Sequence, residues 1–210
     1  KISGMRIGYD PQVIAPDTPE RLRAAAASAG AEIIHSNTSP LDAAWTDRPE
    51  PPMAPIVPHD IAWTGQSSFD KREAIGKQLA EQGVDAQIIT SPASIAWLFN
   101  IRGGDVACSP LPLGRAILFA DGTADLFVNR NKVTDKLAGH LGNEVALRPE
   151  SELDRRLAKL QGKTIGLDAS QASASFFATM EKVGAEVKRA PAPVALPRAR
   201  TTAGEVPRAR

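Results

Sequence analysis

A turn at Asp121-Gly122 lies between two apolar segments, and it is the feature that most constrains the fold of this chain. Residues 116–119 (Ala-Ile-Leu-Phe) precede the turn, and residues 124–128 (Ala-Asp-Leu-Phe-Val) follow it. An Asp-Gly pair between two such runs is typical of a tight β-hairpin turn. The sequence therefore predicts an antiparallel hairpin over Arg115–Asn129.

Helix and strand patterns alternate on both sides of this hairpin. Helices are indicated where apolar residues recur every three or four positions and glycine ends the pattern, and strands where short apolar runs stand between turns. The expected helices are Thr18 to Gly30 with Thr18 as N-cap, a helix with Asp70 and Glu73 in its first turn that ends at Gly83, Lys132–Leu141, Glu150–Leu160 and Ser170–Val183. The expected strands are residues 5–9, 32–35, 86–90, 164–167 and 186–188. This alternation predicts an α/β layer fold.

Proline divides the chain into parts. Prolines gather in Pro49–Pro58 and again in Pro191–Pro197, so Ser36–Gly65 is expected to be an irregular linker docked on the protein. The unit before it holds only two expected strands and a helix, and we expect further strands upstream. The tail Pro191–Arg210 shows no core-forming pattern and, with the missing initiator Met, favours a segment of a longer protein.

Composition excludes several classes of function. The chain has 25 basic and 24 acidic residues, a net charge of +1 and 5% aromatic residues, so it lacks the basic stripe that nucleic-acid binding requires. No apolar run approaches the roughly 20 residues of a membrane span. A single cysteine, Cys108, excludes an intramolecular disulfide and indicates a reducing compartment, the cytoplasm.

No motif for a metal or a nucleotide is recognisable. The three histidines are far apart in the sequence and have no partner at helical metal-site spacing. Glycine-rich phosphate loops are missing as well. Ser68 and Lys71 match a Ser-x-x-Lys pattern, but we interpret Ser68 as a helix N-cap and Lys71 as solvated, because the other motifs of serine acyl-enzymes are absent.

The most distinctive segment is residues 97–106, Trp-Leu-Phe-Asn-Ile-Arg-Gly-Gly-Asp-Val. A bulky apolar run ends there in Asn100, then Arg102, two glycines and Asp105. The glycines permit a sharp turn, and the planar guanidinium of Arg102 suits a carboxylate or a peptide carbonyl. The alternative is an internal ion pair between Arg102 and Asp105 that only fixes the turn.

Residues 95–106 resemble the middle-domain signature of the large, three-domain Xaa-Pro aminopeptidases. A second block agrees with it, comprising residues 41–49, Pro55, residues 57–59, Gly65 and Asp70-Lys71, which is similar to the linker between the first two domains of that family. Tyr9-Asp10-Pro11 matches a third, shorter block. The chain departs from many relatives at Gln12-Val13-Ile14 and near Cys108.

The resemblance implies an α/β fold of two creatinase N-terminal-like, ribonuclease H-like domains, with mixed sheets flanked by helices and the first domain incomplete. It implies that residues 1–64 are the end of the first domain plus the linker, residues 65–196 the second domain, and residues 197–210 the lead-in to a third, catalytic domain. Asn100, Arg102 and Asp105 become candidates for a substrate cleft or an interdomain contact, with neither catalytic nor metal-binding residues expected in this chain.

The resemblance also implies a function for a longer parent protein. That parent would be a cytoplasmic, homodimeric metallopeptidase that removes the N-terminal residue from peptides with proline at the second position. Its catalytic domain would hold two divalent metals, which are commonly manganese in this family. This chain alone would be inactive and would serve in substrate gating and in dimer or interdomain contacts. Two alternatives stand beside it: a fragment of a creatinase-like hydrolase, and a stand-alone module that binds peptides or proteins without turnover.

Overall fold

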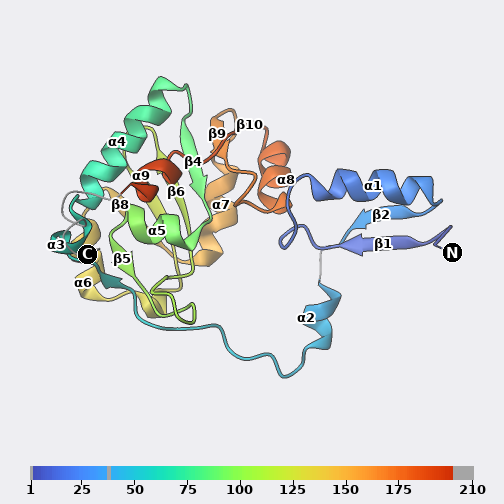
Figure 1. Ribbon diagram of the computed structural model, residues 1–210, viewed down its shortest axis with the longest axis horizontal. Helices are drawn as coiled ribbons and strands as arrows, with labels where there is room; N and C mark the ends of the chain where they lie inside the picture. Colours follow the sequence, from blue (N-terminus) through green and yellow to red (C-terminus); the bar gives the residue numbers. More distant parts are fainter. Residues whose placement is uncertain (1, 37–38, 201–210) are drawn as a thin grey trace.

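The computed structural model describes residues 2–36 and 39–200. A small β-α-β unit at the N-terminal end is joined by a long, largely extended linker to a larger unit built around a mixed sheet (Figure 1). None of the helices in these ranges is long and apolar enough to cross a lipid bilayer.

The first unit contains β1 (Arg6–Tyr9), α1 (Thr18–Ser28) and β2 (Glu32–His35), with the two strands parallel and in hydrogen-bonded register. Its contact with the larger unit runs through the loop before α1. The Ala174 amide donates to the Ile14 carbonyl at 2.9 Å, and the Ser175 amide donates to the Pro11 carbonyl at 3.0 Å. The predicted strands and helix are confirmed, although Asp17 rather than Thr18 occupies the N-cap position.

The linker is more structured than its proline content predicts. It forms two short helices, α2 (Pro40–Ala44) and α3 (Ile61–Thr64), and a short strand, β3 (Val57–Pro58). Each helix starts at a capping side chain, since Ser39 Oγ accepts from the Asp42 amide and Asp60 Oδ1 from the Ala62 amide. The linker also contributes Ile56, which is 0% exposed, so the predicted docking of the linker on the larger unit is confirmed at Ile56. The expectation of an entirely irregular segment was wrong.

The larger unit contains a six-stranded sheet in the order β10-β9-β4-β6-β7-β8. These strands are β4 (Ala86–Ile89), β6 (Arg115–Phe119), β7 (Ala124–Phe127), β8 (Val145–Arg148), β9 (Thr164–Leu167) and β10 (Glu186–Arg189). β6 and β7 form the predicted hairpin, in which Gly122 takes a φ of 82° at the turn. β6 is also antiparallel to β4, whereas β4–β9, β9–β10 and β7–β8 are parallel pairs.

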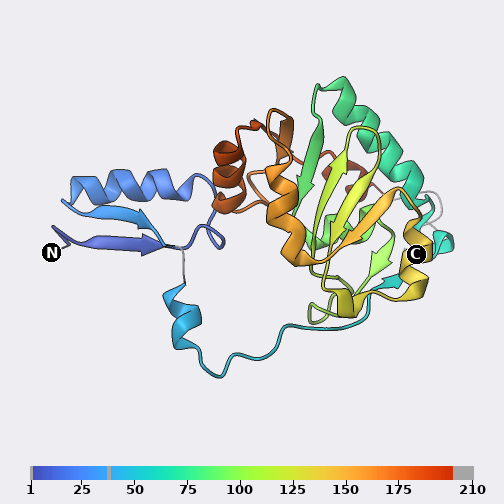
Figure 2. The same ribbon diagram turned by 180° about the vertical axis from the view of Figure 1, so that it is seen from behind.

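Helices cover both faces of this sheet (Figures 1 and 2). One face packs against α4 (Ser68–Glu81), α5 (Pro92–Leu98) and α6 (Asp135–Leu141), and the other against α7 (Leu153–Ala158) and α8 (Ala174–Val183). The short helix α9 (Ala195–Ala199) contacts α5. Successive residues of β4 supply the two cores, since Ile88 packs on the α8 side and Ile89 on the α4 side. The architecture is the predicted α/β fold with a mixed sheet between helices.

Several local predictions need correction. The helix expected from Lys132 starts as a 3-10 turn, η1 (Arg130–Lys132), and then breaks, because the Thr134 side chain caps a separate α6. The helix expected from Glu150 likewise divides into η2 (Glu150–Glu152) and α7. The tail was predicted to add nothing to the core, yet Val194 is 0% exposed inside it. The part of that prediction that concerns residues 201–210 lies outside the described residues.

Candidate functional site

The loop that carries the candidate residues Asn100, Arg102 and Asp105 begins where α5 ends. Pro92 occupies the first turn of α5, where its missing N–H costs no hydrogen bond. Ile95 and Leu98 are fully buried, and Asn100 then takes a left-handed conformation with a φ of 50°. Asparagine tolerates that conformation better than most residues. The turn redirects the chain into β5 (Ile101–Arg102), which pairs antiparallel with β3 of the linker.

Asn100 fastens the linker to the larger unit. Its side chain is buried at 2% exposure; Nδ2 donates to the Gln66 carbonyl at 2.8 Å, and Oδ1 accepts from Lys71 Nζ at 2.6 Å. Its backbone carbonyl accepts from the His59 amide at 2.7 Å. Nδ2 and the backbone carbonyl therefore hold residues 59–66 in place, while Oδ1 binds Lys71 on α4.

Lys71 is the centre of this contact, and the prediction of a solvated lysine was wrong. The residue is 2% exposed, and its ammonium donates to the Trp97 carbonyl at 3.1 Å and lies 4.4 Å from the centroid of the Trp97 ring. A cation over an aromatic face is stabilised further by the ring quadrupole. The expected N-cap was wrong too, because Ser67 and not Ser68 caps α4 by accepting from the Asp70 amide.

Arg102 lies at the base of the loop and is half-buried. Its Nη1 donates to the Ile101 carbonyl at 2.9 Å. Beyond it, Gly103 packs so closely that a Cβ there would lie 2.9 Å from Pro112 Cα. The missing side chain of Gly103 therefore allows the close backbone approach that the sequence predicted, whereas a Cβ on Gly104 would lie 3.0 Å from Ala54 Cβ.

Asp105 points into the protein rather than toward a cleft. Its Oδ2 accepts from Lys132 Nζ at 2.7 Å and from the Leu113 amide at 2.6 Å, and the side chains of Asp105 and Lys132 are 0% and 5% exposed. The other oxygen, Oδ1, is buried without a partner among the described residues. The ion pair expected within the turn thus forms with Lys132, 27 residues away, instead of with Arg102.

The structure therefore separates the three candidates. Asn100 and Arg102 lie next to the linker at β5, whereas Asp105 lies on the inner side of the loop beside Lys132. Sequence reasoning missed Lys132, and its position after a polar Arg-Asn pair gives no signal of burial. Within residues 2–36 and 39–200 there is also no group of three or more His, Cys, Asp or Glu side chains arranged to hold a metal.

His59 gives this site a dependence on pH. Burial lowers its pKa from 6.5, the cations of Arg102 and Lys71 lower it further, and Asp60 opposes them. Because the pKa of His59 is lower in the folded chain than in the unfolded chain, the unfolded chain binds more protons, and stability is lost as pH falls below 6.5.

We expect the free energy of unfolding to fall more steeply between about pH 7 and about pH 5 for the natural chain than for His59→Gln. Urea unfolding at each pH measures this, and equal slopes would contradict it.

Comparison with known proteins identifies relatives for most of the chain. Residues 47–205 match the family described as Creatinase/Prolidase N-terminal domain. Aminopeptidase P2 of Arabidopsis thaliana is 32% identical over 181 residues, which cover 84% of this chain and 25% of that protein. A probable Xaa-Pro aminopeptidase P of Coccidioides posadasii is 32% identical over 75% of this chain and 24% of its own length.

Among solved structures, a cytosolic X-prolyl aminopeptidase with a di-nuclear active site from Caenorhabditis elegans superimposes with a TM-score of 0.85. The superposition covers 98% of this chain and 34% of that one at 21% identity, so it establishes a shared fold. The chain spans about a quarter of the length of the two curated relatives.

Proposed function

The chain belongs to the creatinase/prolidase N-terminal domain family, and on this premise we propose that it is the non-catalytic front part of an Xaa-Pro aminopeptidase. The observation that carries the proposal is the extent of the similarity to Aminopeptidase P2. The similarity covers 84% of the 210 residues, which is about 176 residues. Only 164 residues lie between positions 47 and 210, so the similar region must include some of the first 46 residues. The similarity is thus not confined to the family domain.

The parent protein would release the N-terminal residue from peptides with proline at the second position, in the cytoplasm and as a homodimer. Two divalent metals, manganese in our proposal, would supply Lewis-acid activation of water. The described residues of this chain do not fit such a centre, because they bring no three suitable ligands together. The metals would be held by a catalytic domain that follows residues 197–210, and this chain would contribute no catalytic group.

Within the parent, residues 1–64, 65–196 and 197–210 would serve as the end of a first domain with its linker, a second domain, and a lead-in. The loop after α5 would shape the substrate cleft or an interdomain contact. Arg102 is the side chain best suited to this role, because it is half-buried and can present a planar cation. Asn100 and Asp105 would hold the backbone on either side of Arg102, through the linker contact and through Lys132.

Replacing Arg102 by alanine in the full-length protein tests this proposal. We expect kcat/KM for Xaa-Pro peptides to fall about tenfold, as for the loss of one charged hydrogen bond, with an unchanged thermal unfolding midpoint. Arg155→Ala is the matched control, since this arginine lies on α7 with a side chain that is 70% exposed. Unchanged kinetics would remove Arg102 from the substrate site, and a full-length protein without Xaa-Pro activity would refute the peptidase assignment.

A further inference from the structure

A pocket of about 560 Å³ lies where α4 begins and α6 ends. Its lining comes from four separate segments: the end of β3 with the start of α3, the first turns of α4, Asn100, and the end of α6 with the loop after it. The pocket is separate from the inner side of the loop, where Asp105 meets Lys132. Its two ends differ in charge.

The α4 end of the pocket carries polar groups that lack partners. Ser68 and Arg72 are one helical turn apart and are 7% and 2% exposed, and Ser68 Oγ and Arg72 Nε are buried without a hydrogen-bond partner among the described residues. Buried polar atoms in native proteins are nearly always paired, so two orphans in one pocket indicate a missing group. The 14-residue helix α4 adds the positive end of its dipole here.

Arg72 is held in place without being neutralised. Its Nη1 donates to the Gly122 carbonyl at 2.5 Å, and none of the ion pairs formed between described residues includes Arg72. Burial lowers the pKa of Arg72, and the carboxylate of Glu144 opposes that effect from a distance. A carboxylate entering beside Arg72 and Ser68 would offset the desolvation of the guanidinium.

The opposite end is negative. α6 ends at Leu141 and leaves its last carbonyl groups near Gly142. The Glu144 carboxylate folds back over this end, where its Oε2 would lie 3.1 Å from a Cβ on Gly142. Asp60 also lines the pocket, but its Oδ1 accepts from the Ala62 amide at 2.7 Å. His140 is engaged as well, with Nε2 2.9 Å from the Phe99 carbonyl oxygen.

We propose that this pocket binds a free amino acid in its zwitterionic form, with the carboxylate on Ser68 and Arg72 and the ammonium facing Glu144. A simple anion matches only one end, and a simple cation only the other. Ile61 and Phe69 also line the pocket and are 59% and 51% exposed, which provides an apolar surface for the ligand side chain. The ligand class is therefore an amino acid with an apolar side chain. The site goes beyond the proposed peptidase function and does not depend on it.

Titration of the 210-residue chain with L-leucine, followed by two-dimensional amide NMR, tests the proposal. We expect signals around Ser68 and Gly142 to shift, with leucinamide and N-acetyl-leucine binding at least about tenfold more weakly, because each lacks one charge. Ser68→Ala and Glu144→Gln should each weaken the binding of L-leucine by about tenfold. Arg72 is left unchanged, since its guanidinium also bonds Gly122.

The control variant is Glu181→Gln, an exposed residue on α8 that does not line the pocket and should leave binding unchanged. Three results would overturn the proposal: no shift at L-leucine concentrations of tens of millimolar, equal binding of L-leucine and its two blocked forms, or binding of inorganic phosphate with no binding of L-leucine. The last result would mark a site for oxyanions alone. Since the readout is binding, these outcomes are independent of any peptidase assay.

Discussion

Asp105→Asn is expected to lower the free energy of unfolding by about 3 to 5 kcal/mol, the cost of removing one partner from a buried ion pair. The substitution keeps the size of the side chain but leaves the ammonium of Lys132, 5% exposed, without its counter-charge. The amide of Leu113 can still find an acceptor in the new side chain, so the loss reports chiefly on charge. Urea unfolding of the 210-residue chain measures it.

Two further variants make the Asp105 result interpretable. Asp47→Asn removes a carboxylate from an exposed position in the linker and should change stability by less than about 0.5 kcal/mol. Asp105→Asn combined with Lys132→Met should recover part of the loss, because no buried charge then lacks a partner. If Asp105→Asn folds with unchanged stability while the full-length protein loses the proposed Xaa-Pro peptidase activity, Asp105 acts on substrate and the structural role is wrong.

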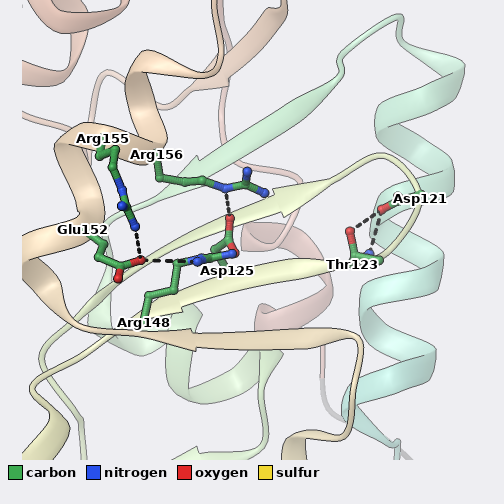
Figure 3. A network of polar contacts seen from close by, with 7 residues as sticks. All are labelled: Asp121, Thr123, Asp125, Arg148, Glu152, Arg155 and Arg156. Atoms are coloured by element: carbon green, nitrogen blue, oxygen red, sulfur yellow. Dashed lines mark hydrogen bonds and ion pairs between the residues drawn. The ribbon is translucent and has the colours of Figure 1, made fainter.

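Asp125→Asn is expected to lower the free energy of unfolding by about 2 to 3 kcal/mol. This loss is smaller than that expected for Asp105→Asn, because water reaches the arginine partners of Asp125. Asp125 is a buried acid on β7 at 2% exposure, and Figure 3 shows it between Arg148 of β8 and Arg156 of α7. Arg148 Nε lies 2.5 Å from Oδ1, and Arg156 Nε donates to Oδ2. The hydrogen bond with Asp125 raises the pKa of Arg148. The neutral amide introduced by the substitution would leave both cations facing an uncharged group.

The matched control for Asp125 is Asp121, at the turn of the same hairpin and also drawn in Figure 3. Asp121 is an exposed acid whose Oδ1 accepts from the amide and the hydroxyl of Thr123 in the hairpin turn. Asp121→Asn retains an acceptor for both bonds and should cost less than about 1 kcal/mol. Thermal and urea unfolding compare the two variants. Equal losses at both positions would show that Asp125 contributes no more than a surface turn does.

The part of the fold that depends on local sequence could be predicted. The hairpin followed from Asp121-Gly122, and the strand Thr164–Leu167 was placed at its observed ends, because a short apolar run between turns has few other conformations. α5 was missed, since its apolar residues run together and do not alternate with a polar face. β8 was missed too: its four residues form a strand by pairing with β7, a contact that the local pattern does not encode.

The candidate site was predicted only in part for a similar reason. Arg102 and Asp105 are close in sequence, and a local ion pair was the simplest expectation. The close approach of Gly103 to Pro112 turns the loop inward and brings Asp105 to Lys132. Partners separated by 27 residues are set by tertiary structure, so no spacing rule could identify them. The orphaned atoms of Ser68 and Arg72 are likewise visible only in three dimensions.

Ile56, at the end of the linker, and Val194, just before α9, are both 0% exposed and belong to the same hydrophobic core on the α4 side of the sheet. A mechanical load applied to the chain directly before residue 56 or directly after residue 194 would therefore reach the same hydrophobic core. The second core, beneath α7 and α8, is reached separately, because the first unit accepts hydrogen bonds from the Ala174 and Ser175 amides at the start of α8. The α4-side core would therefore transmit force between the linker and the segment that follows residue 194.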